Sequence, residues 1–261
     1  MRMMLNVVSK DIEKNFYDPT MKGLDWKGMT EQAKQKIDSA QSVAEMKRAI
    51  FAELDRVAPP GAILASSTST IVASLFTEEL NGRHRCLVAH PVNPPHLVPL
   101  VELVGAPWTA PQTVADAQAI YAAAGQVPIV VRREIEGFIL NRLQAVLLSE
   151  AFRLVESGYV TPQDLDKTLK DGLGLRWSFM GPFETIELNA PGGIPDYCAR
   201  YGPSLARLSA ANPAIYAGDG LARLLALWGE APRTDEVAAR MRWRDRRLAA
   251  LKAHKRGEPA A

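Results

Sequence analysis

The fold is decided by four short pieces of sequence: ILASSTS at 63–69, LVAHPVNP at 87–94, LVELV at 100–104 and GFILNR at 137–142. Each piece contains or continues an apolar run of the kind that forms a buried strand or helix. Each also carries polar side chains, and a buried hydroxyl, imidazole or carboxylate costs several kcal/mol unless it has a hydrogen-bond partner. We therefore expect these polar groups to partner one another in a functional site.

Predicted strands and helices alternate through the first half of the chain. Apolar residues three or four apart predict a helix from Ala44 to Val57, and Pro111 opens another helix that ends at Gly125. This alternation predicts an open, doubly wound and mainly parallel α/β sheet, covered on both faces. The predicted strands cover 62–65, 86–89, 98–104 and 127–131, and a helical turn is predicted over 71–76.

After Glu134 the predicted elements are all helical. A long helix over 138–157 ends at Gly158, and Thr161 and Pro162 provide the N-cap and the first residue of the next helix. Further helices are predicted over 196–207, 220–228 and 235–255. We therefore expect three parts: a helical leader over 1–42 with a helix at 30–40, a partial α/β domain over 43–133 and an all-α domain over 134–261.

Composition narrows the class of protein. The chain has 261 residues, of which 47% are hydrophobic and 23% are charged, and its net charge is +2, so we expect a globular protein that does not bind nucleic acid. Its basic run at 240–256 is expected to be a solvated face or a dimer rim. No apolar run reaches the roughly 20 residues that span a membrane. Cys86 and Cys198 are the only cysteines, and because Cys86 lies in an apolar run we expect a buried thiol there instead of a disulfide, in a cytoplasmic protein.

His90 and Glu102 form the central pair of the candidate site. His90 ends one predicted strand and Glu102 lies within the next. Neighbouring strands lie about 4.8 Å apart, which brings the two side chains within reach of each other. A carboxylate beside a histidine fixes its tautomer and supports the imidazolium, which makes a general base. Ser69 and Asn141 add neutral groups that can hold an oxygen as it changes between hydroxyl and carbonyl.

Each of these residues also has an ordinary structural explanation. Ser69 follows a strand within a Ser/Thr run, where serine is usually a turn residue or a helix cap. His90 can be structural before its proline-rich loop, and Glu102 can mark a strand with one solvated face. Asn141 can face solvent. From the residues alone both interpretations stay open.

Further motifs extend this pattern into a resemblance to a known family. From about Ala44 to Lys255 the chain resembles the 3-hydroxyacyl-CoA dehydrogenase family, specifically the lambda-crystallin branch, whose members act as L-gulonate 3-dehydrogenases. The resemblance implies a Rossmann-like domain that binds NAD, followed by a helical substrate and dimerisation domain. It is carried by the four pieces above together with SEA at 149–151, GLGLR at 172–176, MGPFET at 180–185, LNA at 188–190 and WRD at 243–245.

The resemblance also implies a reaction. His90 would remove the proton of a 3-hydroxyl group while hydride leaves the same carbon for NAD. Glu102 would orient His90, while Ser69 and Asn141 would bind the reacting oxygen. The substrate would be a small 3-hydroxy acid such as L-gulonate or a 3-hydroxyacyl-CoA.

Other residues gain expected roles from the same resemblance. Asn93 would lie near the nicotinamide end of the cofactor, Lys47 would approach its ribose, and Ser69 would also face the cofactor. Arg176 is a candidate for binding a substrate carboxylate, since an arginine holds one bidentately. We expect no metal ion. A homodimer is expected through the apolar face of the long helix, formed by Leu143, Val146, Leu147 and Leu154.

One departure from the family concerns the cofactor. The family begins with a strand, a Gly-x-Gly-x-x-Gly turn and a helix that together hold the pyrophosphate. Residues 1–42 contain only Gly23 and Gly28, and the Gly172-x-Gly174 pair follows a helix instead of a strand. We therefore expect NAD to bind weakly or not at all, and the sheet to have an unpaired edge. The alternative function is a catalytically impaired remnant that acts as a structural or ligand-binding protein.

The first residues resemble a different family. NFYDP at 15–19 and GLDW at 23–26 are similar to the helical entry segment of carboxy-terminal processing serine proteases. The PDZ module and the Ser-Lys catalytic part of those proteases have no counterpart here, so protease activity is not implied. We interpret the chain as a fusion joined near 41–45, and a docking role for 1–42 is a further possibility.

Overall fold

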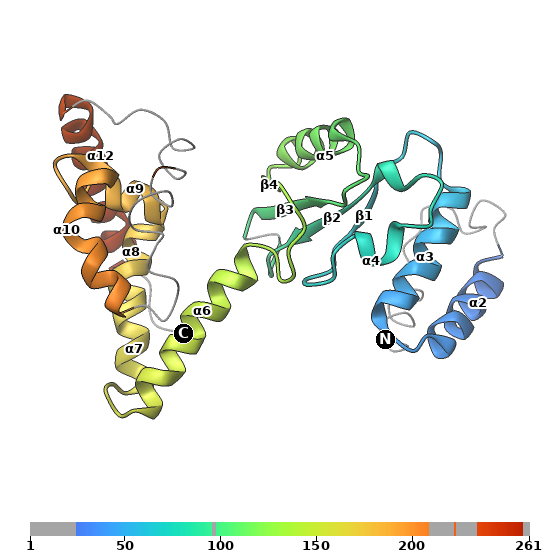
Figure 1. Cartoon of the computed structure of the whole chain (residues 1–261), viewed down its shortest axis with the longest axis horizontal. Helices are drawn as coiled ribbons and strands as arrows, with labels where there is room; N and C mark the ends of the chain where they lie inside the picture. Colours follow the sequence, from blue (N-terminus) through green and yellow to red (C-terminus); the bar gives the residue numbers. More distant parts are fainter. Residues whose placement is uncertain (1–24, 96–97, 209–221, 223–233, 258–261) are drawn as a thin grey trace. The chain divides into compact units, whose positions relative to one another are not determined.

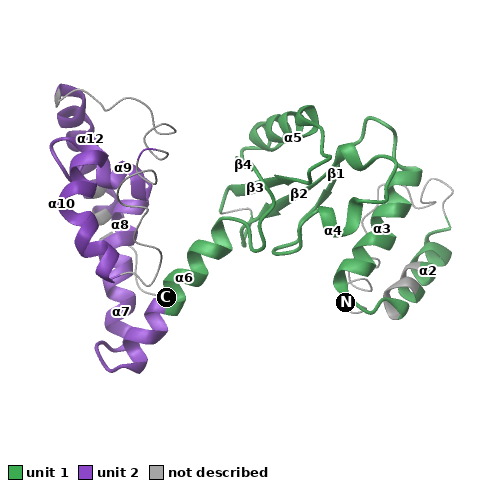
Figure 2. Cartoon of the chain, viewed as in Figure 1, with its two compact units in different colours: residues 1–149 green, residues 150–261 purple. Residues whose placement is uncertain are grey.

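The computed structural model describes residues 25–95, 98–208, 222 and 234–257, which form two compact units. Residues 1–149 belong to the first unit and residues 150–261 to the second (Figure 2). The predicted leader motif at 15–19 lies outside the described residues, as does most of the predicted helix at 220–228. In the first unit the elements are α2 (Trp26–Ser39), α3 (Val43–Val57), β1 (Leu64–Ser66), α4 (Ser74–Thr77), η2 (Arg83–Arg85), β2 (Cys86–Pro91), β3 (Leu100–Gly105), α5 (Pro111–Ala123), β4 (Val127–Val131) and the start of α6 (Leu140–Glu156).

The sheet of the first unit has the strand order β1-β2-β3-β4. β1 runs parallel to β2 and β3 runs parallel to β4, whereas β2 and β3 are antiparallel. The predicted mainly parallel α/β sheet is therefore present, but its central pairing runs the other way. Residues 92–99 alone link β2 to β3, and a parallel crossover needs a dozen residues or more. That short link was the sequence signal for the antiparallel pair.

Helices cover both faces of the sheet, with α5 on one face and α3 and α4 on the other (Figure 1). The side chains of β2 alternate accordingly. Cys86 and Val88 join the apolar cluster of Phe51, Phe76 and Phe138, while Leu87 and Ala89 pack with Ala117 of α5. His90 continues the first of these two series, because successive strand residues point to opposite faces.

The helix α3 is less covered than its sequence predicts. Its N-terminus is capped as expected, since Ser42 Oγ accepts a hydrogen bond from the Glu45 N–H at 3.1 Å. Of its predicted apolar face Met46 is buried, but Ile50, Leu54 and Val57 are exposed. β1 beside it forms one edge of the described sheet.

The second unit is helical, as predicted. Thr161 caps α7 through a hydrogen bond from the Asp164 N–H to Thr161 Oγ1 of 3.1 Å. Both cysteines of the chain are free and buried, one in each unit, and burial raises the pKa of the Cys86 thiol to about 11. None of the described helices is long and apolar enough to cross a membrane. The elements of the second unit are the remainder of α6, α7 (Pro162–Thr168), η3 (Leu169–Leu173), α8 (Gly174–Trp177), α9 (Pro182–Glu187), α10 (Gly193–Leu208) and α12 (Thr234–Gly257).

Candidate active site

His90 and Glu102 are direct neighbours in the antiparallel pair of β2 and β3. His90 Nδ1 lies 2.8 Å from Glu102 Oε2, and both side chains are buried. An ionised Glu102 accepts a hydrogen bond from the N–H at Nδ1, which leaves Nε2 as the basic nitrogen of the ring. The two residues therefore form the arrangement of a histidine base with a carboxylate behind it.

The other carboxylate oxygen of Glu102 is held by the start of α6. Glu102 Oε1 accepts hydrogen bonds from the backbone N–H groups of Ile139, at 2.8 Å, and Leu140, at 3.0 Å. The first N–H groups of a helix have no partner within the helix, and the positive end of the helix dipole lies there. The chain around Gly137 and Phe138 offers no capping side chain, so Glu102 serves as the acceptor for these two N–H groups while its other oxygen contacts His90.

Asn141 and Ser69 are brought together by the same helix. Asn141 Nδ2 donates a hydrogen bond of 2.7 Å to the Ser69 carbonyl oxygen. The loop that carries Ser69 is tied a second time, because Glu134 Oε1 accepts a hydrogen bond of 2.8 Å from the Ser74 N–H. The first turn of α6 thus connects the segment after β1 with the carboxylate of β3.

Lys47, in α3, places its side chain against the last residue of β1. Its Nζ donates a hydrogen bond of 2.9 Å to Ser66 Oγ and lies 5.7 Å from the centre of the Phe76 ring. Partial burial lowers the pKa of the Lys47 ammonium group. Sequence reasoning named Lys47 but gave Ser66 no role, since one serine among several in a Ser/Thr run carries no separate signal.

Asn93 and Arg176 are two other predicted site residues, and among the described residues Asn93 makes no hydrogen bond with His90, Glu102, Ser69 or Asn141. Asn93 is exposed in the loop after β2. Arg176 lies in α8 of the second unit. Their expected roles toward cofactor and substrate stay predictions.

An apolar cavity of about 670 Å³ lies beside Asn141. Its walls come from the segment before α6 and from the first two turns of that helix, including Ile139, Leu143 and Val146. Thr70, from the loop after β1, also lines it. Arg142 and Glu136 supply its charged groups. The cavity gives a substrate carbon chain a place next to the polar group of Asn141.

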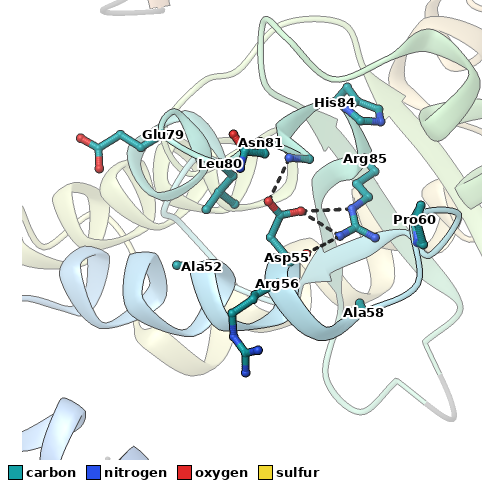
Figure 3. Close-up of a pocket in the computed structure, with 11 residues that line it drawn as sticks. Ala52, Asp55, Arg56, Ala58, Pro60, Glu79, Leu80, Asn81, His84 and Arg85 are labelled. Carbon is teal, nitrogen blue, oxygen red and sulfur yellow. Dashed lines mark hydrogen bonds and ion pairs between the residues drawn. The ribbon is translucent and has the colours of Figure 1, made fainter.

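A second cavity, of about 600 Å³, lies at the other end of the strands (Figure 3). Arg85, which lines it, directly precedes β2, so this cavity is at the amino ends of β1 and β2. Figure 3 shows the Asp55 carboxylate facing the Arg85 guanidinium, at 2.8 Å between Oδ1 and Nη2. Open α/β sheets bind ligands at the carboxyl ends of their strands, and we regard this pair as a structural brace.

Comparisons with known proteins identify a family for both parts of the chain. Residues 20–135 match the model of the 3-hydroxyacyl-CoA dehydrogenase NAD binding domain, and residues 137–217 match the model of the C-terminal domain of that enzyme. The first match begins inside the segment 1–42 that we predicted to be a leader of other origin. That leader, and the predicted divisions at 42 and 133, stay predictions.

Relatives and solved structures point the same way. A lambda-crystallin homolog of Bos taurus is 47% identical over 215 residues, which cover 80% of this chain and 67% of the relative. An L-carnitine dehydrogenase of Pseudomonas sp is 41% identical over 169 residues, covering 64% of this chain and 53% of the relative. The crystal structure of a 3-hydroxyacyl-CoA dehydrogenase from Archaeoglobus fulgidus is 26% identical with a TM-score of 0.65, covering 84% of this chain and 76% of that one.

This chain spans about two thirds of the length of the lambda-crystallin homolog that it matches. The two matched ranges cover the sheet of the first unit, which carries His90 and Glu102, and a large part of the helical second unit. The chain therefore belongs to the 3-hydroxyacyl-CoA dehydrogenase family, in its lambda-crystallin branch.

Proposed function

We propose that the chain catalyses the NAD-dependent oxidation of the 3-hydroxyl group of a small hydroxy acid, with His90 as the general base. The observation that carries this proposal is the buried contact of 2.8 Å between His90 Nδ1 and Glu102 Oε2. It leaves Nε2 to take up the hydroxyl proton, while Glu102 stabilises the imidazolium that results. When bound, NAD supplies the acceptor for the hydride that leaves the same carbon.

Ser69 and Asn141 are proposed to hold the reacting oxygen. The bond from Asn141 Nδ2 to the Ser69 carbonyl uses one of the two amide hydrogens. The second hydrogen and the Ser69 hydroxyl remain to bind an oxygen that gains negative charge as its proton leaves. Asn141 lies in the first turn of α6, and Ser69 follows the end of β1.

The residues of the first unit fit one half of the cofactor better than the other. Lys47 at the end of β1 and Asn93 after β2 are proposed to face the ribose and nicotinamide, with Ser69 between them. The whole sequence contains no Gly-x-Gly-x-x-Gly, so the backbone cradle for the pyrophosphate is missing from it. We therefore propose that this 261-residue chain binds NAD weakly.

Isothermal titration calorimetry with NADH tests the cofactor proposal. We expect a dissociation constant in the millimolar range or no measurable heat, because the phosphate contacts are lost. A micromolar dissociation constant would contradict weak binding and show that other residues replace the glycine turn.

The catalytic proposal is tested by the reduction of 3-keto acids with NADH at saturating concentration. We expect His90→Gln to lower kcat by about 10²- to 10⁴-fold, because general acid–base catalysis contributes that much and His90 returns its proton to the substrate oxygen in this direction. His84→Gln is the matched control, since His84 is exposed in η2 before β2. Equal activity of the wild type and His90→Gln would contradict the role of His90.

Within this reaction we propose a sugar acid such as L-gulonate as the substrate, ahead of a 3-hydroxyacyl-CoA. The similarity to lambda-crystallin homologs supports this choice. Arg176 is proposed to bind the substrate carboxylate. We expect kcat/KM to be higher for L-gulonate than for 3-hydroxybutyryl-CoA, and Arg176→Gln to raise KM for the sugar acid. The opposite order would exclude the sugar acid as the preferred substrate.

A second candidate function is a non-catalytic, ligand-binding protein that keeps the fold. The missing glycine turn favours it, because every catalytic step needs bound NAD. This candidate predicts no turnover in the wild type even at millimolar NADH, together with an intact fold by circular dichroism. The same NADH assay thus separates the two candidates.

A further inference from the structure

Phe138 has a backbone conformation that side chains rarely adopt. Its φ is 51°, and it follows Gly137 at φ 76°, so two consecutive residues lie in the left-handed region. Residues other than glycine are disfavoured there. Phe138 is also fully buried. Such a conformation persists only where the surrounding structure holds it, and these positions cluster at functional sites.

The left-handed turn places the Phe138 ring beside His90 and two backbone N–H groups beside Glu102. The Phe138 ring lies 5.4 Å from the His90 ring, centre to centre, with the ring planes tilted by 49°. The next two residues, Ile139 and Leu140, donate their N–H groups to Glu102 Oε1 at 2.8 Å and 3.0 Å. Oε2 of the same carboxylate therefore stays available for His90 Nδ1.

We propose that Phe138 is a positioning residue that fixes the tautomer and orientation of His90. The inference rests on the proposed function of His90 as the base. The ring of Phe138 packs against the imidazole, and its turn aims two N–H groups at Glu102. Together they hold the ring with its proton on Nδ1 and its lone pair on Nε2. Phe138 acts through His90 and Glu102 and touches no reacting atom.

A packing role alone makes a different prediction. Phe138 belongs to the apolar cluster that also contains Phe51 and Phe76. If Phe138 only filled that cluster, its loss would change stability and leave the imidazole as it was. Loss of another ring from the cluster would then have the same effect. A measurement on the His90 ring nitrogens distinguishes the two roles.

The test is the ¹H–¹⁵N correlation spectrum of the histidine rings in the full chain, without cofactor or substrate, at alkaline pH. The chain has four histidines, and His90→Gln identifies the signals of His90. The variants are Phe138→Leu, which keeps apolar volume without the ring, and Phe138→Gly, which also frees the backbone. Phe51→Leu is the matched control, because Phe51 is a buried ring of the same cluster.

We expect the wild type and Phe51→Leu to show His90 with its proton on Nδ1. In Phe138→Leu and Phe138→Gly the ring-nitrogen signals of His90 shift toward the other tautomer. Unchanged His90 signals in both Phe138 variants would overturn the inference, as would the other tautomer in the wild type. If Phe138→Gly fails to fold, Phe138→Leu decides the outcome by itself.

The spectrum does not depend on turnover, so its result is separate from the test of the proposed function. A chain with the expected tautomers but no NADH oxidation would contradict the function and keep the positioning. Where turnover is measurable, Phe138→Leu lowers kcat by about ten- to hundredfold with KM nearly unchanged, since misplaced catalytic groups cost that much. Phe51→Leu leaves kcat within about twofold of the wild type.

Discussion

Glu102 accepts hydrogen bonds from three places, and both of its oxygens are used. Oε2 faces His90 Nδ1, while Oε1 binds the N–H groups of Ile139 and Leu140. A neutral amide of the same shape has one oxygen and one NH₂ group. With its oxygen on the two N–H groups, it presents a donor to Nδ1, and the histidine is forced to carry its proton on Nε2. The carboxylate of Glu102, and not its shape alone, is therefore needed to keep the His90 proton on Nδ1.

We predict that Glu102→Gln lowers kcat by at least about 10²-fold, because Nε2 can no longer accept a proton. Glu134→Gln is the matched control, since Glu134 also accepts a backbone N–H, from Ser74, but does not face a histidine. Steady-state kinetics of the oxidation of L-gulonate by NAD measure both variants, because Nε2 accepts the hydroxyl proton in that direction. Comparable kcat values for Glu102→Gln and Glu134→Gln would show that the carboxylate charge has no catalytic role.

At the scale of elements, a buried ion pair joins the last turns of α3 to η2, just before β2. Arg85 donates to both Asp55 Oδ1 and the Asp55 carbonyl at 2.8 Å, and Asp55 Oδ2 accepts the Gly82 N–H at 2.9 Å. A Cβ at Gly82 would lie 2.0 Å from Asp55 Oδ1, so a larger residue there would displace the Asp55 carboxylate. Burial by itself raises the pKa of Asp55, but the Gly82 N–H and the Arg85 guanidinium outweigh it and hold that pKa below its usual range.

We predict that Asp55→Asn destabilises the first unit by about 2–4 kcal/mol, because Arg85 keeps a buried charge without its partner. A lowered folded-state pKa gives stability above the unfolded value of about 3.9, and this stability is lost as pH falls through the lower folded value. The wild type should therefore lose stability below about pH 4 more steeply than Asp55→Asn. Urea unfolding curves with equal slopes against pH would contradict this assignment.

The elements also show how far sequence patterns reach. β4 has the predicted bounds Val127–Val131 and β2 begins at the predicted Cys86, because unbroken apolar runs between turn residues leave little choice. The contact of Glu102 with the start of α6 was not predictable in this way. It joins residues 37 and 38 positions apart through backbone groups, and backbone N–H groups leave no trace in side-chain patterns.

Sequence patterns predicted the contact at the centre of the site, but not how much of α3 is exposed. The closeness of His90 and Glu102 was predicted from adjacent strands, and the register of β2 and β3 places them opposite each other. The partial exposure of Ile50, Leu54 and Val57 was not predicted. Periodicity indicates which helix face is apolar, but it does not indicate how closely other elements pack against that face.

At the scale of the whole molecule, α6 carries a row of exposed apolar side chains. Leu143 is 65% and Val146 is 73% exposed, and Leu147 is exposed beside them. Exposed apolar patches of this kind mark interaction sites. The family resemblance implies a homodimer through this helix, and we propose that these residues form its contact.

We predict that the wild type sediments as a dimer and that Val146→Glu sediments as a monomer, because an unpaired charge is costly inside an interface. Gln144→Glu is the matched control, as it adds the same charge to the same helix two residues away, on a different face. Sedimentation velocity separates the two states. A wild type that is monomeric, or a Val146→Glu variant that stays dimeric, would rule out this interface.

The central claim is that His90 takes the proton of the substrate hydroxyl in oxidation, and returns it in reduction, while hydride passes between the substrate carbon and the nicotinamide. The most direct measurement is the transfer of deuterium from NADH labelled at carbon 4 of the nicotinamide to carbon 3 of a 3-keto acid, at saturating NADH. We predict that the wild type and His84→Gln both form product with deuterium at carbon 3, and that His90→Gln does so at least about 10²-fold more slowly. Product without deuterium, or equal rates for His90→Gln and the wild type, would contradict the claim.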